Sequence, residues 1–185
     1  MNRPTDAPEP AVDLPQMLSL FYREDQTELL GRFESIEAEA IPEPHRSLLD
    51  HHSHMTVAVE SHFGSPVDVE IVRSTKDNEW YAREILLRSQ ADQTIVQYGI
   101  VRLRYGLLES SVWDEIEGGK KPLGRVLIEH EVLRQVELVG LWQVQCGRNL
   151  ARHFNVAEDT RTFGRTARIF CDEEPAIELL EIVRP

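Results

Sequence analysis

The segment Trp80-Tyr81-Ala82-Arg83-Glu84-Ile85-Leu86-Leu87 is the most informative part of this chain, because it predicts a β-strand with an arginine on its apolar side. Side chains alternate across a strand, so Tyr81, Arg83, Ile85 and Leu87 share one face. A guanidinium keeps its charge in any protein environment, and burying that charge without a partner is costly. Arg83 therefore requires a carboxylate from the protein or from a ligand, unless its side chain reaches water.

The last predicted strand of the chain also has a charged residue on its apolar face, in this case a glutamate. Residues 175–185 predict a strand in which Glu181 lies on the same face as Leu179 and Val183. A buried carboxyl has a raised pKa unless a cation or hydrogen-bond donors keep it ionised. An Arg and a Glu on apolar strand faces predict either an internal ion pair or two walls of one polar pocket.

Composition bounds the class of protein. The chain has 185 residues, 41% of them hydrophobic, and a net charge of -12, which predicts one domain with a substantial core and disfavours binding to nucleic acid or anionic membranes. No apolar run is long enough to span a membrane. We expect a disordered tail at 1–13, a single domain at 14–185 and a cytoplasmic protein in which Cys146 and Cys171 are reduced thiols.

The order of the predicted elements indicates the fold class. Few of the predicted strands are followed by a helix long enough for a parallel crossover, so the sequence predicts an α+β fold with a mainly antiparallel, six-stranded sheet and helices on one face. Helices are predicted at 14–30, 46–63, 108–116, after residue 122 and at 146–154, and strands at 67–71, 80–87, 94–104, 134–144, 163–171 and 176–183.

A cluster of histidines raises the possibility of a metal site. His52 and His54 are two residues apart, so on a helix they would not share a face, and only Asp50 has the spacing to join His54. The loop Gly118-Gly119-Lys120-Lys121 lacks the spacing and the hydroxyl residue of a phosphate-binding loop. We therefore expect neither a metal nor a cofactor.

Three separated segments resemble the chorismate pyruvate-lyase family. Trp80–Leu87 resembles its arginine-bearing strand, Gly119-Lys120-Lys121-Pro122-Leu123-Gly124-Arg125 its Gly-Lys-x-Pro-Leu-Gly-Arg loop, and Phe163-Gly164-Arg165-Thr166 its Gly-Arg strand start. A last strand with Glu181 shortly before a proline also fits, and the match covers roughly residues 48–185. The resemblance implies a six-stranded antiparallel sheet with helices on one face and a buried ligand, which agrees with the fold predicted from the residues.

The resemblance also implies an activity. The chain would be a carbon–oxygen lyase that converts chorismate to 4-hydroxybenzoate and pyruvate without a cofactor. Arg83 would hold the ligand carboxylate, and Glu181 would face the oxygen at the opposite end of the ring. The other residues implied at the site are Met55 and Leu123, through their backbone N–H groups, Thr56, Gly99 beside the pocket, and Gly124, which lets the loop approach closely.

Two alternatives remain open at this point. One is a related enzyme that makes another hydroxybenzoate. The other is a non-catalytic domain that binds an aromatic carboxylate, because the effector domains of some bacterial transcription regulators share this fold. Those regulators carry an attached DNA-binding helix-turn-helix, for which we expect residues 1–13 to be too few. The sequence gives no oligomeric state.

Overall fold

One sheet organises the molecule. The computed structural model describes residues 12–132, 134–171 and 173–185, so the tail predicted at 1–13 falls mainly outside the described residues. The strands are β1 (Gly31–Ser35), β2 (Val67–Lys76), β3 (Trp80–Ser89), β4 (Ile95–Arg104), β5 (Arg134–Cys146), β6 (Arg161–Cys171) and β7 (Glu174–Val183). They form one antiparallel sheet of seven strands in the order β1-β5-β6-β7-β4-β3-β2.

The predicted α+β class is confirmed, with one strand more than expected. The additional strand is β1, which pairs with β5 at one edge of the sheet. Its five residues include Arg32 and Glu34, and neither β-branched residues nor a long apolar run marks it as a strand. Its position is therefore set by pairing with β5 rather than by its own sequence.

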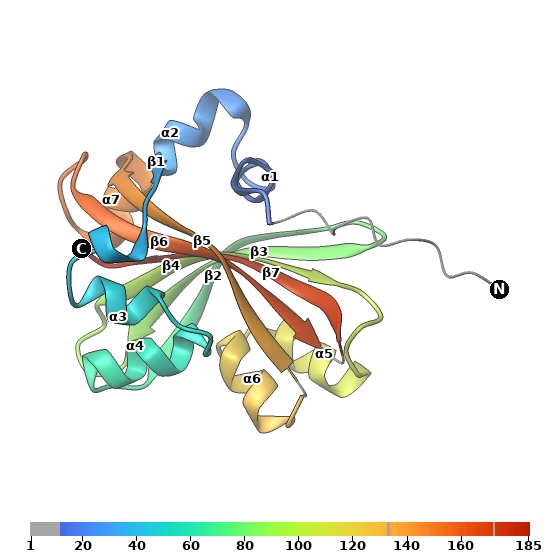
Figure 1. Cartoon of the computed structure of the whole chain (residues 1–185). Coiled ribbons are helices and arrows are strands. Elements are labelled where there is room, and N and C mark those ends of the chain that lie inside the picture. Colours follow the sequence, from blue (N-terminus) through green and yellow to red (C-terminus); the bar gives the residue numbers. More distant parts are fainter. Residues whose placement is uncertain (1–11, 133, 172) are drawn as a thin grey trace.

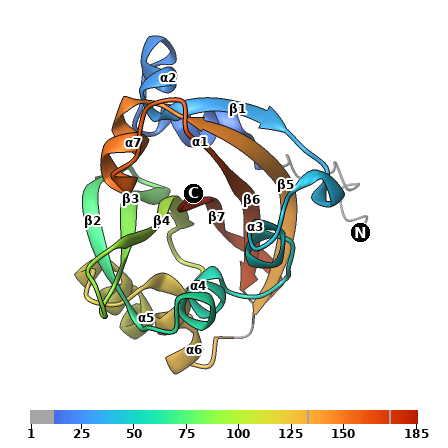
Figure 2. The same ribbon diagram turned by 90° about the vertical axis from the view of Figure 1, so that its left-hand side faces the viewer.

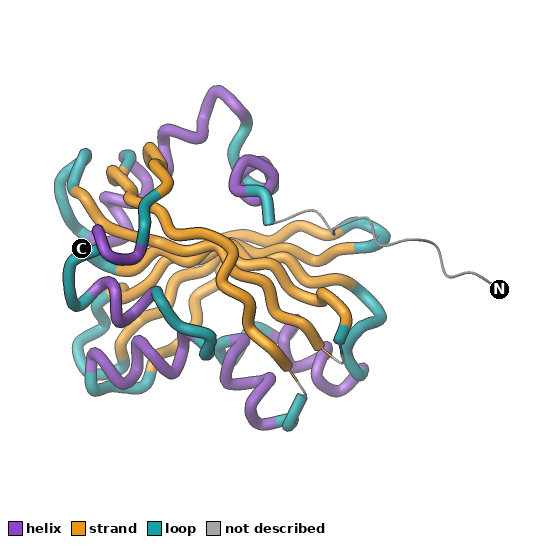
Figure 3. Tube along the Cα trace, in the orientation of Figure 1, coloured by secondary structure: helices purple, strands orange, loops and turns teal. Residues whose placement is uncertain are grey.

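Helices cover both faces of the sheet. They are α1 (Leu14–Ser19), η1 (Glu24–Gln26), α2 (Thr27–Leu30), η2 (Ala38–Ala40), α3 (His45–Leu49), α4 (Met55–Phe63), α5 (Ser110–Gly118), α6 (Leu123–Glu129) and α7 (Arg148–Phe154). Helices α3 to α6 lie on one face, here called the front, whereas α1 and α7 pack on the opposite, back face (Figures 1 and 3). The sheet curves strongly around the front helices (Figure 2).

Coverage on both sides explains the composition of the central strands. β3, β4 and β7 are buried on nearly every residue, so each has an apolar front side and an apolar back side. Leu86 and Ile100 pack under α1 and α7, while Ile85 and Val101 face the front helices. In the middle of these strands even charged residues are buried, as Arg83 and Glu84 are on the two faces of β3.

The segment before β1 departs from the predicted helix at 14–30. Helix α1 ends at Ser19, and the chain continues through η1 and α2. The break lets Tyr22 turn inward, where its hydroxyl donates to Glu84 Oε1 over 2.7 Å. Val12, inside the predicted tail, is buried in the back core at 5% exposure.

Glu84 is the centre of a buried polar cluster on the back face. Tyr98 donates to the same Oε1 over 2.6 Å, and the Arg73 Nε donates to Oε2. The Arg73 guanidinium also lies over the Tyr22 ring, 4.8 Å from its centre. Burial and the Glu84 carboxylate raise the pKa of both tyrosines, so they remain neutral donors. The cluster ties the segment before β1 to β2, β3 and β4.

We expect Tyr98→Phe to lower the free energy of unfolding by about 1.5–3 kcal/mol, because it removes a hydrogen bond to a buried charged group. Urea unfolding measures the change. Tyr105→Phe is the matched control, because the Tyr105 ring contacts Trp113 (centroids 4.9 Å apart) outside this cluster. Equal losses in the two variants would contradict a special role for the Glu84 cluster.

Candidate functional site

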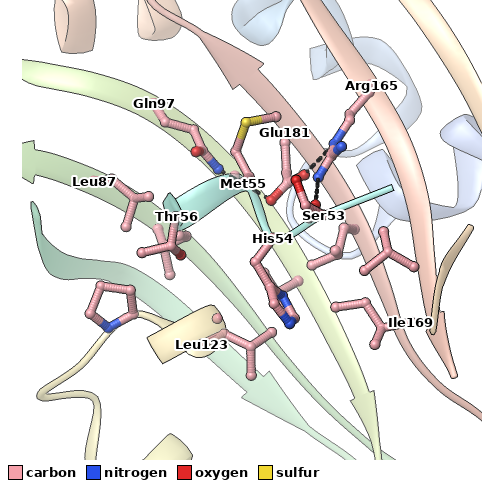
Figure 4. A pocket seen from close by; sticks show the side chains of 17 residues that line it. Ser53, His54, Met55, Thr56, Leu87, Gln97, Leu123, Arg165, Ile169 and Glu181 are labelled. Carbon is pink, nitrogen blue, oxygen red and sulfur yellow. Dashed lines mark hydrogen bonds and ion pairs between the residues drawn. The ribbon is translucent and has the colours of Figure 1, made fainter. Parts of the chain in front are cut away.

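A small cavity lies between the sheet and the front helices. Its volume is about 30 Å³, which is room for a water molecule rather than for an aromatic ring. Its floor comes from β3, β4, β6 and β7, and its roof comes from residues 53–56 and 122–124. The lining residues are Ser53, His54, Met55, Thr56, Ile85, Leu87, Gln97, Gly99, Val101, Pro122, Leu123, Gly124, Val136, Arg165, Ile169, Leu179 and Glu181 (Figure 4).

The structure brings together most of the residues that the sequence indicates. Glu181 lines the cavity, as do the five other residues implied beside the ligand: Met55, Thr56, Gly99, Leu123 and Gly124. Arg83 does not line it. Arg83 lies on the same face of β3 as Ile85, two residues before it, and it lies opposite Val101 of the neighbouring strand β4. Both of those neighbours are part of the cavity wall.

Arg83 is fully buried, at 0% exposure. Its Nη1 donates to the carbonyl oxygen of Ile116 over 2.8 Å, near the C-terminus of α5. Its Nε and Nη2 have no hydrogen-bond partner among the described residues, and no carboxylate of those residues forms an ion pair with it. Burial lowers the pKa of Arg83, and the neighbouring Tyr81 partly offsets this. Two donors of a buried cation are thus unsatisfied.

Glu181 has a different partner from the one that the sequence suggested. It lies opposite Arg165 on the neighbouring strand β6, and Arg165 Nε donates to Glu181 Oε2 over 2.7 Å. Both side chains are buried, at 1% and 9% exposure. The charge of Glu181 is therefore balanced inside the protein, and that of Arg83 is not.

Arg165 also holds the segment between α3 and α4 in place. Its Nη1 donates to the carbonyl oxygens of His51, over 3.0 Å, and Leu49, over 3.4 Å, and its Nη2 donates to that of Ser53 over 3.3 Å. Figure 4 shows this guanidinium between Glu181 and Ser53. Residues 49–53 lead into the roof of the cavity, so the ion pair fixes the roof as well as the charge.

Four polar residues that line the cavity are missing from the predicted site: Ser53 and His54 in the roof, and Arg165 and Gln97 on the sheet. Arg165 follows Phe163 and precedes Ala167 on one strand face, which is the same signal that identified Arg83. Gln97 lies on the same face of β4 as Gly99 and Val101 and is 2% exposed. Its Nε2 lies 3.4 Å from Glu181 Oε1. An uncharged amide on an apolar strand gives a weaker signal than an arginine.

At two positions that line the cavity, glycine allows a close approach between elements that a side chain would hinder. A Cβ at Gly124 would lie 2.9 Å from Thr56 Oγ1, so only glycine allows α6 to approach the start of α4 this closely. A Cβ at Gly99 would lie 3.3 Å from Ile85 Cγ1 in the cavity floor. Met55 and Leu123 are the first residues of α4 and α6, where backbone N–H groups lack intrahelical acceptors.

The described residues give little support for a metal site or a reactive cysteine. Within the described ranges, no three His, Cys, Asp or Glu side chains are grouped so that they could hold a metal ion. Cys146 and Cys171 are free and buried, and burial raises the pKa of the Cys146 thiol to about 11, so it is protonated at neutral pH. None of the described helices is both long and apolar enough to cross a membrane.

Comparison with known proteins relates this chain to others by fold. No family model matches the sequence, and no curated protein matches it. The effector domain of PhnF from Mycobacterium smegmatis is similar, with a TM-score of 0.50, 10% identity and coverage of 71% of this chain and 88% of that domain. The gene product SA0254 from Staphylococcus aureus has a TM-score of 0.51 and 6% identity, with coverage of 73% and 90%.

A third similar structure is described as the ligand-binding domain of a GntR-family transcriptional regulator from Bordetella bronchiseptica. Its TM-score is 0.47 and its identity 11%, and the match covers 63% of this chain and 85% of that one. The chorismate lyase-like fold predicted from the sequence is therefore confirmed, and the effector domain of PhnF has a similar fold.

The predicted activity is wrong. The similar PhnF structure is described as an effector domain and not as a lyase, so a carbon–oxygen lyase that turns chorismate into 4-hydroxybenzoate and pyruvate is not supported. The site gives a physical reason. Arg165 holds Glu181 as a paired carboxylate, whereas a general acid or base needs to exchange a proton with the substrate.

Stability should fall as the pH drops below about 6.5, the ordinary pKa of histidine. Burial, followed by the adjacent Arg165, lowers the pKa of His51, and burial likewise lowers the pKa of His45 and His153. The folded protein then binds fewer protons than the unfolded chain in this range, so the free energy of unfolding decreases with decreasing pH. Urea unfolding between pH 7.5 and pH 5 measures this slope.

His51→Asn should make the slope shallower, because Oδ1 of asparagine can accept from Arg165 as the His51 Nδ1 does over 3.2 Å, without becoming protonated. Ser61→Asn, on the exposed side of α4, is the control and should leave the slope unchanged, because it neither adds nor removes a titratable group. An unchanged slope in His51→Asn would show that other groups carry the pH dependence.

Proposed function

We propose that this chain is a non-catalytic domain that binds a small aromatic carboxylate as an effector. Arg83 holds the ligand carboxylate, and Glu181 faces the opposite end of the ring. We further propose that residues 14–185 form a single domain. The fold supports this assignment, because similar structures carry the descriptions effector domain and ligand-binding domain. The prediction against nucleic-acid binding by this chain stays a prediction.

The buried, half-satisfied charge of Arg83 is the observation that carries the proposal. A core without a function would place an aliphatic residue at this position, because a buried unpaired cation is destabilising. A carboxylate placed beside Nε and Nη2 would accept both N–H groups in the paired geometry that guanidinium favours. Since Arg165 and Glu181 neutralise each other, the site has one uncompensated positive charge and suits a monoanion.

The spacing along β4 suits a ligand with polar groups at both ends. Arg83 lies opposite Val101, and Glu181 lies opposite Gly99, two residues away along β4. The two residues are also on the two strands that flank β4, so strand spacings of about 4.8 Å and an offset of about 7 Å put their backbones about 12 Å apart, and their long side chains can approach a para-substituted benzene ring from opposite ends. Gly99 has no side chain to occupy the space between, and apolar walls from Ile85, Leu123 and other residues suit the ring faces.

Ligand binding requires the cavity to enlarge, because about 30 Å³ does not hold a ring. The sheet is a continuous hydrogen-bonded floor, so the enlargement falls to the roof, formed by residues 53–56 and 122–124. We propose that this roof contributes the backbone N–H groups of Met55 and Leu123 to the ligand. Gly124 and Thr56, which approach each other closely, are also part of the roof. A ligand that moves the roof changes the surface of the domain, as an effector must.

We expect Arg83→Met to weaken the binding of 4-hydroxybenzoate by about 30-fold or more, because a desolvated charge pair is lost. Titration calorimetry measures the affinity. Arg104→Met, which removes a half-exposed arginine on the surface, is the control and should bind as the unmodified protein does. The ligand-free Arg83→Met variant should be no less stable, because an unpaired buried charge is removed.

Unchanged affinity together with a lower melting temperature would show that Arg83 serves the packing of α5 and not a ligand. Incubation with chorismate is a second check. The proposal expects no release of pyruvate, and sustained release would overturn the non-catalytic assignment.

A further inference from the structure

Gln97 places a free hydrogen-bond acceptor inside the cavity. Its side chain lines the cavity at 2% exposure, and its Oε1 has no hydrogen-bond partner among the described residues. Its Nε2 points to Glu181 Oε1, 3.4 Å away, as Figure 4 shows. A buried amide oxygen without a donor is destabilising, so a donor from a bound molecule would satisfy it.

The orientation of this amide is fixed by its neighbour. Turning it over would place the Gln97 carbonyl oxygen against the Glu181 carboxylate, and two acceptors repel each other. Glu181 cannot relieve this repulsion, because its other oxygen is held by Arg165 over 2.7 Å. The Gln97 Oε1 therefore stays an acceptor that needs a donor from elsewhere.

This end of the cavity thus has two acceptors, Gln97 Oε1 and Glu181 Oε1, with the Gln97 Nε2 directed at the second of them. The long contact between Gln97 Nε2 and Glu181 Oε1 leaves the second of these only weakly satisfied. A hydroxyl group has one proton and can satisfy only one acceptor, and its lone pairs then face the other. A primary amine has two N–H groups and can satisfy both.

The charge of the site favours a neutral amine. Glu181 is already paired with Arg165, so an ammonium group placed here would meet the Arg165 guanidinium without a free counter-charge. An aromatic amine is uncharged at neutral pH, whereas an aliphatic amine is a cation. We propose that Gln97 selects for an aromatic carboxylate whose far end carries a neutral primary amine. The inference rests on the proposed function, since it assumes that the carboxylate is held at Arg83.

Four probes test the inference by titration calorimetry: benzoate, 4-hydroxybenzoate, 4-aminobenzoate and 4-(aminomethyl)benzoate, whose amine is a cation. We expect 4-aminobenzoate to bind about tenfold more tightly than 4-hydroxybenzoate, which corresponds to one additional hydrogen bond in a desolvated site. The aminomethyl compound should bind more weakly than 4-aminobenzoate.

Gln97→Leu removes the acceptor at nearly constant volume and should reduce the preference for the amine to about twofold or less, while changing the affinity for benzoate by less than about threefold. Gln97→Met is a second apolar variant, in case the branched side chain prevents folding. The comparison of probes on the unmodified protein needs no variant at all.

The outcomes separate this inference from the proposed function. Binding of the benzoates that depends on Arg83 but shows no preference for the amine would overturn the selection by Gln97 and leave the proposed function intact. A preference for the amine that survives both Gln97 variants would also overturn it. If none of the four probes binds, the proposed function fails, and the inference fails with it.

Discussion

The ion pair between Arg165 and Glu181 is the constraint on which the front face of the molecule depends. It joins neighbouring strands at the centre of the sheet, and through Arg165 it also fixes the carbonyl groups of residues 49–53. A buried ion pair needs good geometry and additional hydrogen bonds to offset desolvation, and Arg165 has both. Because this pair is complete, the charge that remains uncompensated in the site is that of Arg83.

The two faces of β3 show how differently the chain treats buried charge. Arg83 and Glu84 are consecutive and point to opposite sides of the sheet. Glu84 has three side-chain partners, from Tyr22, Tyr98 and Arg73, whereas the hydrogen bond of Arg83 within the described residues goes to a backbone carbonyl, that of Ile116. Both residues are buried equally well, so burial alone does not explain the contrast. The satisfied residue supports the structure, and the unsatisfied one is where the proposed ligand carboxylate would bind.

Alternation along the strands allowed the sheet, its α+β class and the inward positions of Arg83 and Glu181 to be predicted from the sequence. It could not show that Glu181 pairs with Arg165, because the partner of a residue depends on strand order and register, which are tertiary properties. Strand β1 and the break after Ser19 were missed for a similar reason. In both segments, contacts with distant residues override weak local preferences.

The predicted lyase activity failed because a shared fold does not carry a shared reaction. The motifs around Arg83, Leu123 and Glu181 are motifs of a binding cavity, and a cavity that holds a carboxylate is useful to an enzyme and to a sensor alike. An enzyme and a sensor differ in whether the polar groups opposite the ligand carboxylate are free to exchange a proton with the ligand. Here the ion pair commits Glu181 to Arg165, and Gln97, which cannot exchange protons, lies beside it. In the proposed function, such an end would recognise a ligand by its hydrogen-bond donors, because its carboxylate and amide groups are already engaged with each other and with Arg165.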